Sequence, residues 1–266
     1  MNRITATINS LHSKGAKAFI PFITAGYPDI KTTPLLVETL EKAGASIVEL
    51  GMPFSDPLAD GPTIQSSSFE AIRNGTTPDA VFDCIRTIRE TSEIPIILFT
   101  YTNLILRYEI NRFMKRLSSS GGDGLLVPDL PIEEAQLFIK RAHEHNLRMI
   151  FLISPLTLPQ RMKKIEKMSD DFVYCVSITG VTGKRKQLFE RIKPYLQTVS
   201  ATVSKPFVVG FGVSNRDDAR KIAALSDGVV VGSAIINIIK ENKNDANLLK
   251  NVRKFVLNIY RGLSYY

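Results

Sequence analysis

The sequence contains few of the residues that build disulfides and metal sites. Its 266 residues include two cysteines and three histidines. Cys84 lies in a helical pattern and Cys175 in a strand pattern, and neither belongs to a CxxC pair, so we interpret both as buried free thiols. The histidines, His12, His143 and His145, show no HExxH or comparable spacing. The sequence therefore predicts no metal site.

Long hydrophobic runs are also missing. No stretch approaches the roughly 18 apolar residues of a membrane span. The N-terminal segment MNRITATINSLHSKG has no apolar run after its basic residue, so it does not resemble a secretory signal. We therefore expect a cytoplasmic protein that does not enter a membrane.

The charge is mildly basic, with a net value of +8 at pH 7. The basic residues occur in short groups, such as residues 161–164 and 184–186, which acidic and apolar residues interrupt. Basic and aromatic residues do not alternate as a base-stacking surface requires. This pattern argues against a nucleic-acid partner, and an enzyme with a phosphorylated substrate explains the same sign of charge.

The length and the apolar patterning fit an α/β barrel. The chain is close to the roughly 250 residues of a (β/α)8 barrel, and 44% of its residues are hydrophobic. Eight short and mostly apolar runs, many rich in Val and Ile, are typical of parallel strands that are covered on both faces. These predicted strands are residues 18–24, 47–51, 95–101, 124–128, 148–153, 172–177, 207–212 and 228–232.

Helical patterns alternate with these runs. The pattern of residues 133–145 opens with two acids after Pro131, which suits a helix N-terminus. The other predicted helices are residues 33–43, 159–168, 187–199, 215–225 and 247–263, with an extra leading helix at 2–13. Eight β/α alternations without a composition break predict one domain over residues 1–266, a (β/α)8 TIM barrel with an extra N-terminal helix. A doubly wound open sheet is disfavoured, because no GxGxxG turn follows the first run.

Glu49 is an anomaly in the second predicted strand, because a carboxylate stands inside an apolar run. Active groups of (β/α)8 barrels lie at the carboxyl ends of the strands. Burial disfavours the charged form, so the pKa of Glu49 should rise, which suits a general acid or base near neutral pH. Alternation places Glu49 on one face with Ile47 and Gly51, and we expect Gly51 to leave room above it. The alternative is a strand glutamate satisfied by a neighbouring donor.

The loop after this strand carries two aspartates, Asp56 and Asp60, among three prolines and a glycine over residues 52–62. Proline and glycine restrict such a loop, which makes it a candidate lid over the site. Both aspartates could instead serve as turn-forming residues. The spacing alone leaves the two interpretations open.

Glycines gather at the ends of the late predicted strands. They are Gly180 and Gly183 after the sixth run, Gly210 and Gly212 in the seventh, and Gly232 at the end of the eighth. Glycines allow backbone N–H groups to approach an anion, and a helix N-terminus adds partial positive charge. We therefore predict a phosphate site here, with residues 234–239 after Ser233 as a short phosphate-binding helix that follows the eighth strand.

Several segments carry a family resemblance. The longest is ELGMPFSDPLADGPTIQ at residues 49–65. The shorter ones are PFITAG at 21–26, PDLP at 128–131, GVTG at 180–183, GFG at 210–212 and GSAI at 232–235. In sequence and in order, these segments resemble the tryptophan synthase α subunit family over residues 18–239.

The resemblance implies a carbon–carbon lyase that cleaves indole-3-glycerol phosphate to indole and glyceraldehyde 3-phosphate, a retro-aldol reaction in the last steps of L-tryptophan biosynthesis. It implies that Glu49 moves the proton at indole C3 and that Asp60 accepts a hydrogen bond from the indole N–H. Thr182 would orient Asp60 when the loops close. The positions that match the indole pocket, each of which could also be plain barrel core, are Phe22, Leu126, Tyr174, Phe211 and Val230. The positions that match the phosphate site are Gly183, Gly212, Gly232 and Ser233.

The resemblance also implies a partner. The α chain itself would hold no cofactor, and it would pass indole to a β subunit that carries pyridoxal phosphate, within an α2β2 heterotetramer. Pro53, Asp56 and Pro57, in the loop of residues 53–60, would face the β subunit.

Three positions depart from the usual pattern of the family, namely Ser46, Glu70 and Leu104. Glu70 replaces a frequent arginine near the base of the lid loop, where it could alter loop closure or coupling to the partner. A Schiff-base aldolase is disfavoured, because none of the eight runs contains a lysine. A non-catalytic regulatory subunit that retains the barrel stays open as an alternative.

Overall fold

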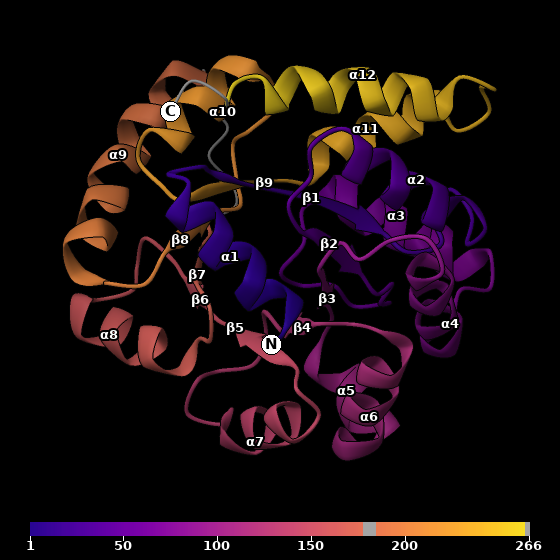
Figure 1. Cartoon of the computed structure of the whole chain (residues 1–266), viewed down its shortest axis with the longest axis horizontal. Helices are drawn as coiled ribbons and strands as arrows, with labels where there is room; N and C mark the ends of the chain where they lie inside the picture. The colour runs from indigo at the N-terminus through magenta and orange to yellow at the C-terminus, as the bar shows by residue number, and fades with distance from the viewer. Residues whose placement is uncertain (178–184, 264–266) are drawn as a thin grey trace.

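The structure is a computed structural model that describes residues 1–177 and 185–263. Figure 1 shows its strands at the centre and most of its helices around them. All of the strand pairs described are parallel. The strands are β1 (Ala18–Thr24), β2 (Val48–Gly51), β3 (Ile96–Phe99), β4 (Gly124–Leu126), β5 (Arg148–Ile150), β6 (Leu152–Ile153), β7 (Val173–Cys175), β8 (Phe207–Val209) and β9 (Gly228–Val231).

The strands close into a barrel. The first strand, β1, pairs with both β2 and β9, so the first and last strands of the chain lie side by side. The sheet order begins at β5 and ends at β6, and these segments are parts of the one predicted strand 148–153, interrupted at Phe151. There the Phe151 N–H donates to the Ser169 hydroxyl at 3.1 Å, and the Phe151 carbonyl accepts from the Tyr174 N–H at 3.0 Å. The predicted (β/α)8 barrel is confirmed, with its fifth strand divided into two segments.

Helices surround the barrel, except for α1, which lies across one end of it (Figure 1). The helices described are α1 (Arg3–Ser13), α2 (Thr32–Lys42), α3 (Pro62–Arg73), α4 (Pro78–Arg89), α5 (Thr102–Tyr108), α6 (Ile110–Ser120), α7 (Gln136–Glu144), α8 (Pro159–Met168), α9 (Arg185–Thr202), α10 (Arg216–Ala223), α11 (Ser233–Asn242) and α12 (Leu248–Tyr260). The predicted helices are present, with shifts at their ends. Helix α7 begins later than predicted, because Glu134 and Ala135 bond to carbonyls three residues before them and form turns instead. Helices α3, α4, α5 and α6 are additional to the prediction.

The strands are buried on both faces, as their apolar runs predict. All of β1, for example, is buried. One face packs against the outer helices, and the other fills the barrel. The core that fills the barrel consists of Ile4, Ile8, Ala18, Ile20, Ile47, Ile97, Leu126, Ile150, Phe172, Tyr174, Val208 and Val230. Because Ile4 and Ile8 belong to α1, this helix covers the end of the barrel at which the strands begin.

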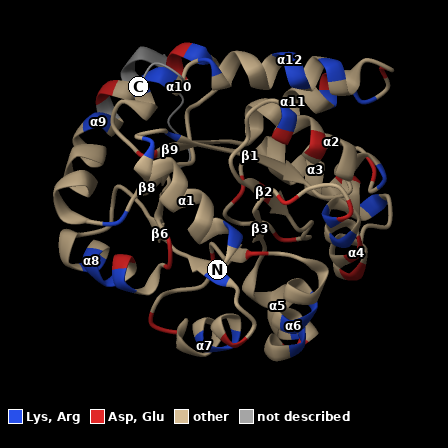
Figure 2. Ribbon diagram, viewed as in Figure 1, with Lys and Arg blue, Asp and Glu red and all other residues tan. Residues whose placement is uncertain are grey.

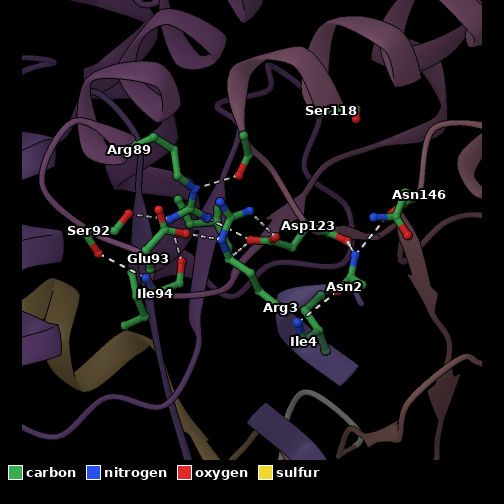
Figure 3. Close-up of polar contacts among 12 residues, drawn as sticks. Asn2, Arg3, Ile4, Arg89, Ser92, Glu93, Ile94, Ser118, Asp123 and Asn146 are labelled. Atoms are coloured by element: carbon green, nitrogen blue, oxygen red, sulfur yellow. Dashed lines mark hydrogen bonds and ion pairs between the residues drawn. The ribbon is translucent and has the colours of Figure 1, made fainter. Parts of the chain in front are cut away.

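A polar network fastens α1 to this end of the barrel (Figure 3). The Asn2 amide donates to the backbone carbonyls of Asp123 and Asn146 at 2.9 and 2.8 Å. The Asp123 carboxylate, 3% exposed, accepts from Arg3 at 3.0 Å and from Arg89 at 2.7 Å, each on a different oxygen. The predicted extra N-terminal helix is therefore tied to the barrel by directed polar contacts as well as by apolar packing.

The charges are distributed over the outer helices. Figure 2 shows Lys and Arg on several of them, together with Asp and Glu, for example on α8. Within the described ranges, no helix has both the length and the apolar character that crossing a membrane would require.

Candidate active site

Glu49 points into the barrel from β2. In the sheet it stands beside Phe22 of β1 and Ile97 of β3, and Ile47, two residues earlier on the same face, belongs to the core that fills the barrel. The carboxylate is 1% exposed. The Tyr174 hydroxyl donates to its Oε2 atom at 3.3 Å, whereas Oε1 has no hydrogen-bond partner among the described residues. One buried acceptor atom is thus available to a substrate.

Burial sets the ionisation of Glu49. Loss of solvent raises the pKa of this carboxyl from 4.5 to about 8, although the hydrogen bond from Tyr174 lowers it. The nearby charge of Asp60 raises the pKa of Glu49 further. The two acids predicted from the sequence therefore lie close enough to influence each other.

Asp60 lies in the loop between β2 and α3. Its N–H donates to the Pro57 carbonyl at 3.0 Å, which closes a turn. The side chain is half-buried, and burial raises the pKa of the Asp60 carboxyl to about 6. The Tyr101 hydroxyl acts in the opposite direction and lowers this pKa. Asp60 is thus turned inward from a loop whose neighbouring residues 58 and 59 are exposed.

Tyr101 is a site residue that the sequence did not single out. It follows β3 and is 2% exposed, and its ring packs against Phe99 and Phe54 at centroid distances of 5.9 and 5.1 Å. Its hydroxyl is near Asp60, yet within the described chain it has no partner at hydrogen-bonding geometry. The available signal was its position at the carboxyl end of a predicted strand, where polar groups of barrel sites gather.

Four of the five predicted indole-pocket residues are buried inside the strands of the barrel. Phe22, Leu126, Tyr174 and Val230 come from β1, β4, β7 and β9. The fifth residue, Phe211, is half-buried after β8 and packs against the larger hydrophobic core rather than the cluster that fills the barrel. Leu126, Tyr174 and Val230 thus belong to the cluster that fills the barrel, and Phe22, which belongs to the larger core, stands beside Glu49 in the sheet.

The expectation that Gly51 leaves room above Glu49 is wrong. A Cβ atom at Gly51 would lie 2.6 Å from the Phe22 ring, so that ring fills the space that the absent side chain provides. The Phe22 Cβ atom and its ring atom Cδ1 lie 3.4 and 3.5 Å from the position that a Cβ at Gly232 would occupy. Phe22 therefore stands between the strand that carries Glu49 and the start of α11.

The predicted phosphate residues lie at the ends of two adjacent strands. Gly212 follows β8 with a φ of 74°, a conformation that favours glycine, and Gly232 follows β9 as the N-cap of α11. Ser233 is the exposed first residue of this helix, which is longer than the predicted segment 234–239. The first N–H groups of a helix have no acceptor within it, and Gly232 has no side chain to cap them, so they are available to an anion. Thr182 and Gly183 lie outside the described residues.

The residues of the lid loop that the sequence predicted to face a partner differ in their exposure. Pro53 and Pro57 are buried within the chain, and Asp56 is exposed. Leu58 in the same loop is 92% exposed. The exposed residues of this loop are therefore Ser55, Asp56, Leu58 and Ala59, whereas the two prolines are covered by the chain.

Glu70, which stands where the family frequently has an arginine, forms an ion pair. Its carboxylate accepts an ion-paired hydrogen bond from Lys243 at the end of α11, at 2.6 Å. Ser46, another departure, accepts a hydrogen bond from the Phe19 N–H at 3.2 Å and thus supports the start of β2. Glu70 therefore links α3 to α11 instead of leaving an unbalanced charge near the loop.

A cavity of about 460 Å³ lies elsewhere, between α9 and the segments that lead into β8 and β9. Lys17, Gln197 and Asp227 are among its lining residues, which places it at the end of the barrel opposite to Glu49. Among the residues that the structure describes, no group of three or more His, Cys, Asp or Glu side chains is arranged to hold a metal ion.

Active sites of (β/α)8 barrels lie at the carboxyl ends of the strands. Glu49, Asp60 and the start of α11 occupy this end, so the fold and the site define an enzyme of the (β/α)8-barrel class. The sequence matches the family described as "Tryptophan synthase alpha chain" over residues 8–261.

Individual relatives agree with this match. The tryptophan synthase alpha chain of Caldanaerobacter subterraneus is 45% identical over 259 residues, which cover 97% of this chain and 98% of that protein. The Gloeobacter violaceus protein is 45% identical over 238 residues, with 89% and 86% covered. The solved structure of tryptophan synthase subunit alpha from Legionella pneumophila has a TM-score of 0.91 and 35% identity over 100% of both chains. The chain belongs to the tryptophan synthase α chain family, whose members are lyases of tryptophan biosynthesis.

Proposed function

We propose that this chain cleaves indole-3-glycerol phosphate to indole and glyceraldehyde 3-phosphate, with Glu49 and Asp60 as its catalytic residues. The observation that carries the proposal is the pair of neighbouring carboxyls whose pKa values differ, about 8 for Glu49 and about 6 for Asp60. Environments that separate two such pKa values divide the roles of acid and base between the groups. At pH 7 Glu49 is mainly protonated and Asp60 mainly ionised.

These protonation states suit a retro-aldol cleavage. Glu49 donates its proton to indole C3, while the Asp60 carboxylate accepts a hydrogen bond from the indole N–H, where positive charge develops. The carboxylate left on Glu49 then takes the proton of the substrate hydroxyl. The carbon–carbon bond breaks, the aldehyde forms, and the bonding electrons return to the indole ring.

The rest of the substrate fits the surroundings of this pair. Phe22, Leu126, Tyr174 and Val230 supply an apolar interior that suits an indole ring. The uncapped N-terminus of α11, beside Gly212, would hold the phosphate through backbone N–H groups and the helix dipole. Phe22 lies between these two regions, so one ligand can reach both. We also propose that residues 1–266 act as one domain, because β1 completes the sheet with β9.

A β subunit is the proposed partner, in an α2β2 assembly that receives indole from this chain. Exposed leucines follow the second, third and fifth strands of the barrel, on the same end as Glu49. They are Leu58, Leu106, Leu156 and Leu158, between 52% and 92% exposed. Apolar side chains gathered at one end of a protein favour an interaction surface there. Pyridoxal phosphate would belong to the β subunit, with no cofactor in this chain.

Indole release by Glu49→Gln tests the proposal. We expect its kcat to fall at least about a hundredfold, as for loss of a general acid, while inorganic phosphate still binds. The exposed Glu90→Gln variant is the matched control and should retain wild-type turnover. The chain has no tryptophan, so released indole can be followed by fluorescence without an indole group in the chain itself.

The pH profile gives a second readout. Activity of the wild-type chain should fall below about pH 6, where Asp60 takes up a proton, and above about pH 8, where Glu49 loses one. Wild-type turnover by Glu49→Gln would contradict the mechanism. Absence of turnover by the wild-type chain, both alone and with a β subunit, would instead support a regulatory subunit, provided that phosphate still binds.

A further inference from the structure

Gln65 connects the first turns of α3 to the turn that carries Asp60. Its side-chain Nε2 donates to the Asp60 carbonyl at 2.9 Å and lies 3.5 Å from the Pro57 carbonyl. Both neighbours are carbonyl oxygens, which can only accept, so the amide nitrogen of Gln65 must face them. Because the Asp60 N–H also bonds to the Pro57 carbonyl, this one amide reaches both ends of the turn.

Helix α3 gives Gln65 a fixed base. The buried Ser67 hydroxyl lies 2.6 Å from the buried Thr24 hydroxyl at the end of β1. The Ser67 hydroxyl also donates to the Ile64 carbonyl at 2.7 Å. The contact between Ser67 and Thr24 therefore fixes the part of α3 that contains Gln65. At its other end, α3 is joined to α11 by the ion pair of Glu70 and Lys243. The helix is thus anchored both to the end of β1 and to the C-terminal end of α11.

We propose that Gln65 is a positioning residue that holds the Asp60 turn inward, so that the Asp60 carboxylate faces the barrel interior. This inference rests on the proposed role of Asp60. Gln65 touches the backbone of the turn and lies on the helix, so it acts through Asp60 rather than on the substrate. Without its amide, the Asp60 carbonyl turns to water, and the exposed residues around it let the turn move outward.

The effect should fall on kcat rather than on substrate binding. The Asp60 carboxylate stabilises charge that develops during cleavage, whereas the phosphate is held separately at α11. A displacement of about 1 Å in such a group lowers the rate by about a hundredfold. We expect kcat of Gln65→Met to fall between about tenfold and a hundredfold, with KM and phosphate affinity changed less than about twofold.

The experiment compares Gln65→Met, Asp60→Asn and the double variant in the indole-release assay with the full-length chain and a β subunit. If Gln65 acts through Asp60, the double variant should be no slower than Asp60→Asn alone, because coupled residues give non-additive losses. Gln197→Met replaces an exposed helical glutamine at the far end of the barrel and should match the wild type.

The outcomes separate this inference from the proposed function. Wild-type kcat in Gln65→Met, or a further loss of the same size when it is added to Asp60→Asn, would overturn the positioning role while leaving Asp60 in place. A rise in KM equal to the fall in kcat/KM would also overturn it, since that indicates lost substrate binding. Wild-type turnover by Asp60→Asn would refute the proposed function itself, and the positioning role with it.

Discussion

Replacing Glu49 by glutamine should alter the pH dependence of folding stability as well as activity. The pKa of this carboxyl in the folded chain lies above its ordinary value of 4.5, at about 8. Between these values the folded state keeps a proton that the unfolded state releases. Stability associated with the protonated carboxyl is therefore complete below pH 4.5, and it is lost as the pH rises to about 8. Glutamine cannot ionise, so the variant should not show this loss.

The size of the effect follows from the burial of the side chain. Since Glu49 is 1% exposed, solvent does not screen it appreciably. At about 1.4 kcal/mol per pKa unit, a rise from 4.5 to about 8 corresponds to on the order of 5 kcal/mol. About 4 kcal/mol of this should be lost between pH 5 and pH 9 in the wild-type chain. Any change in the hydrogen bond between the variant amide and Tyr174 adds a contribution that does not depend on pH.

Urea unfolding at pH 5, 7 and 9, followed by circular dichroism, measures the difference. The free energy of unfolding of Glu49→Gln, minus that of the wild type, should increase by about 4 kcal/mol from pH 5 to pH 9. Titrating groups that do not interact with Glu49 are common to both proteins and cancel. The control, Glu90→Gln, should run parallel to the wild type. Parallel curves for Glu49→Gln as well would refute the argument that this carboxyl is held protonated by burial.

Two further predictions concern the ends of the barrel. Arg89→Ala should lower the free energy of unfolding by about 3 to 5 kcal/mol, because it leaves the buried Asp123 carboxylate without the more buried of its two arginine partners. Arg3→Ala, at a position 38% exposed, should lower the free energy of unfolding by about 1 kcal/mol. Equal losses for the two variants in urea unfolding would contradict this ranking. Ser233→Asp should weaken inorganic phosphate binding about tenfold in calorimetry, because it adds an anion beside the first N–H groups of α11. Asn237→Asp, exposed one turn later, is its control, and a similar loss there would argue against the assigned phosphate site.

The strands were predictable because each is buried on both faces and therefore reads as a continuous apolar run. The break at Phe151 was not predictable, since it depends on a hydrogen bond to the Ser169 side chain, eighteen residues away. Helix α3 escaped prediction for a different reason. Its buried face includes Ser67, Ser68 and Ala71, so it lacks the apolar repeat that marks an amphipathic helix.

The site was predictable where a residue contradicts its local surroundings. Glu49 stands out because a carboxylate interrupts an apolar strand. Tyr101 does not stand out, because an aromatic residue at the end of an apolar run resembles an ordinary core residue. Gln65 does not stand out either, because a polar residue on a helix resembles an ordinary solvent-exposed residue. The space at Gly51 was misjudged, since it depends on the Phe22 ring of the neighbouring strand. The roles of the residues came from the family resemblance, which local patterns could not replace.

The pairing of β1 with β9 has a consequence for the order in which the barrel can be assembled. The ribosome releases β1 early, but one of its edges has no strand to bind until residues 228–231 have been made. Helix α1 also cannot dock early. Asn2 bonds to the carbonyl of Asn146, and the apolar face of α1 packs against strands from most of the chain. A nascent chain therefore carries an open sheet edge and an undocked amphipathic helix through most of its translation. Both features favour association with other chains until the barrel has closed.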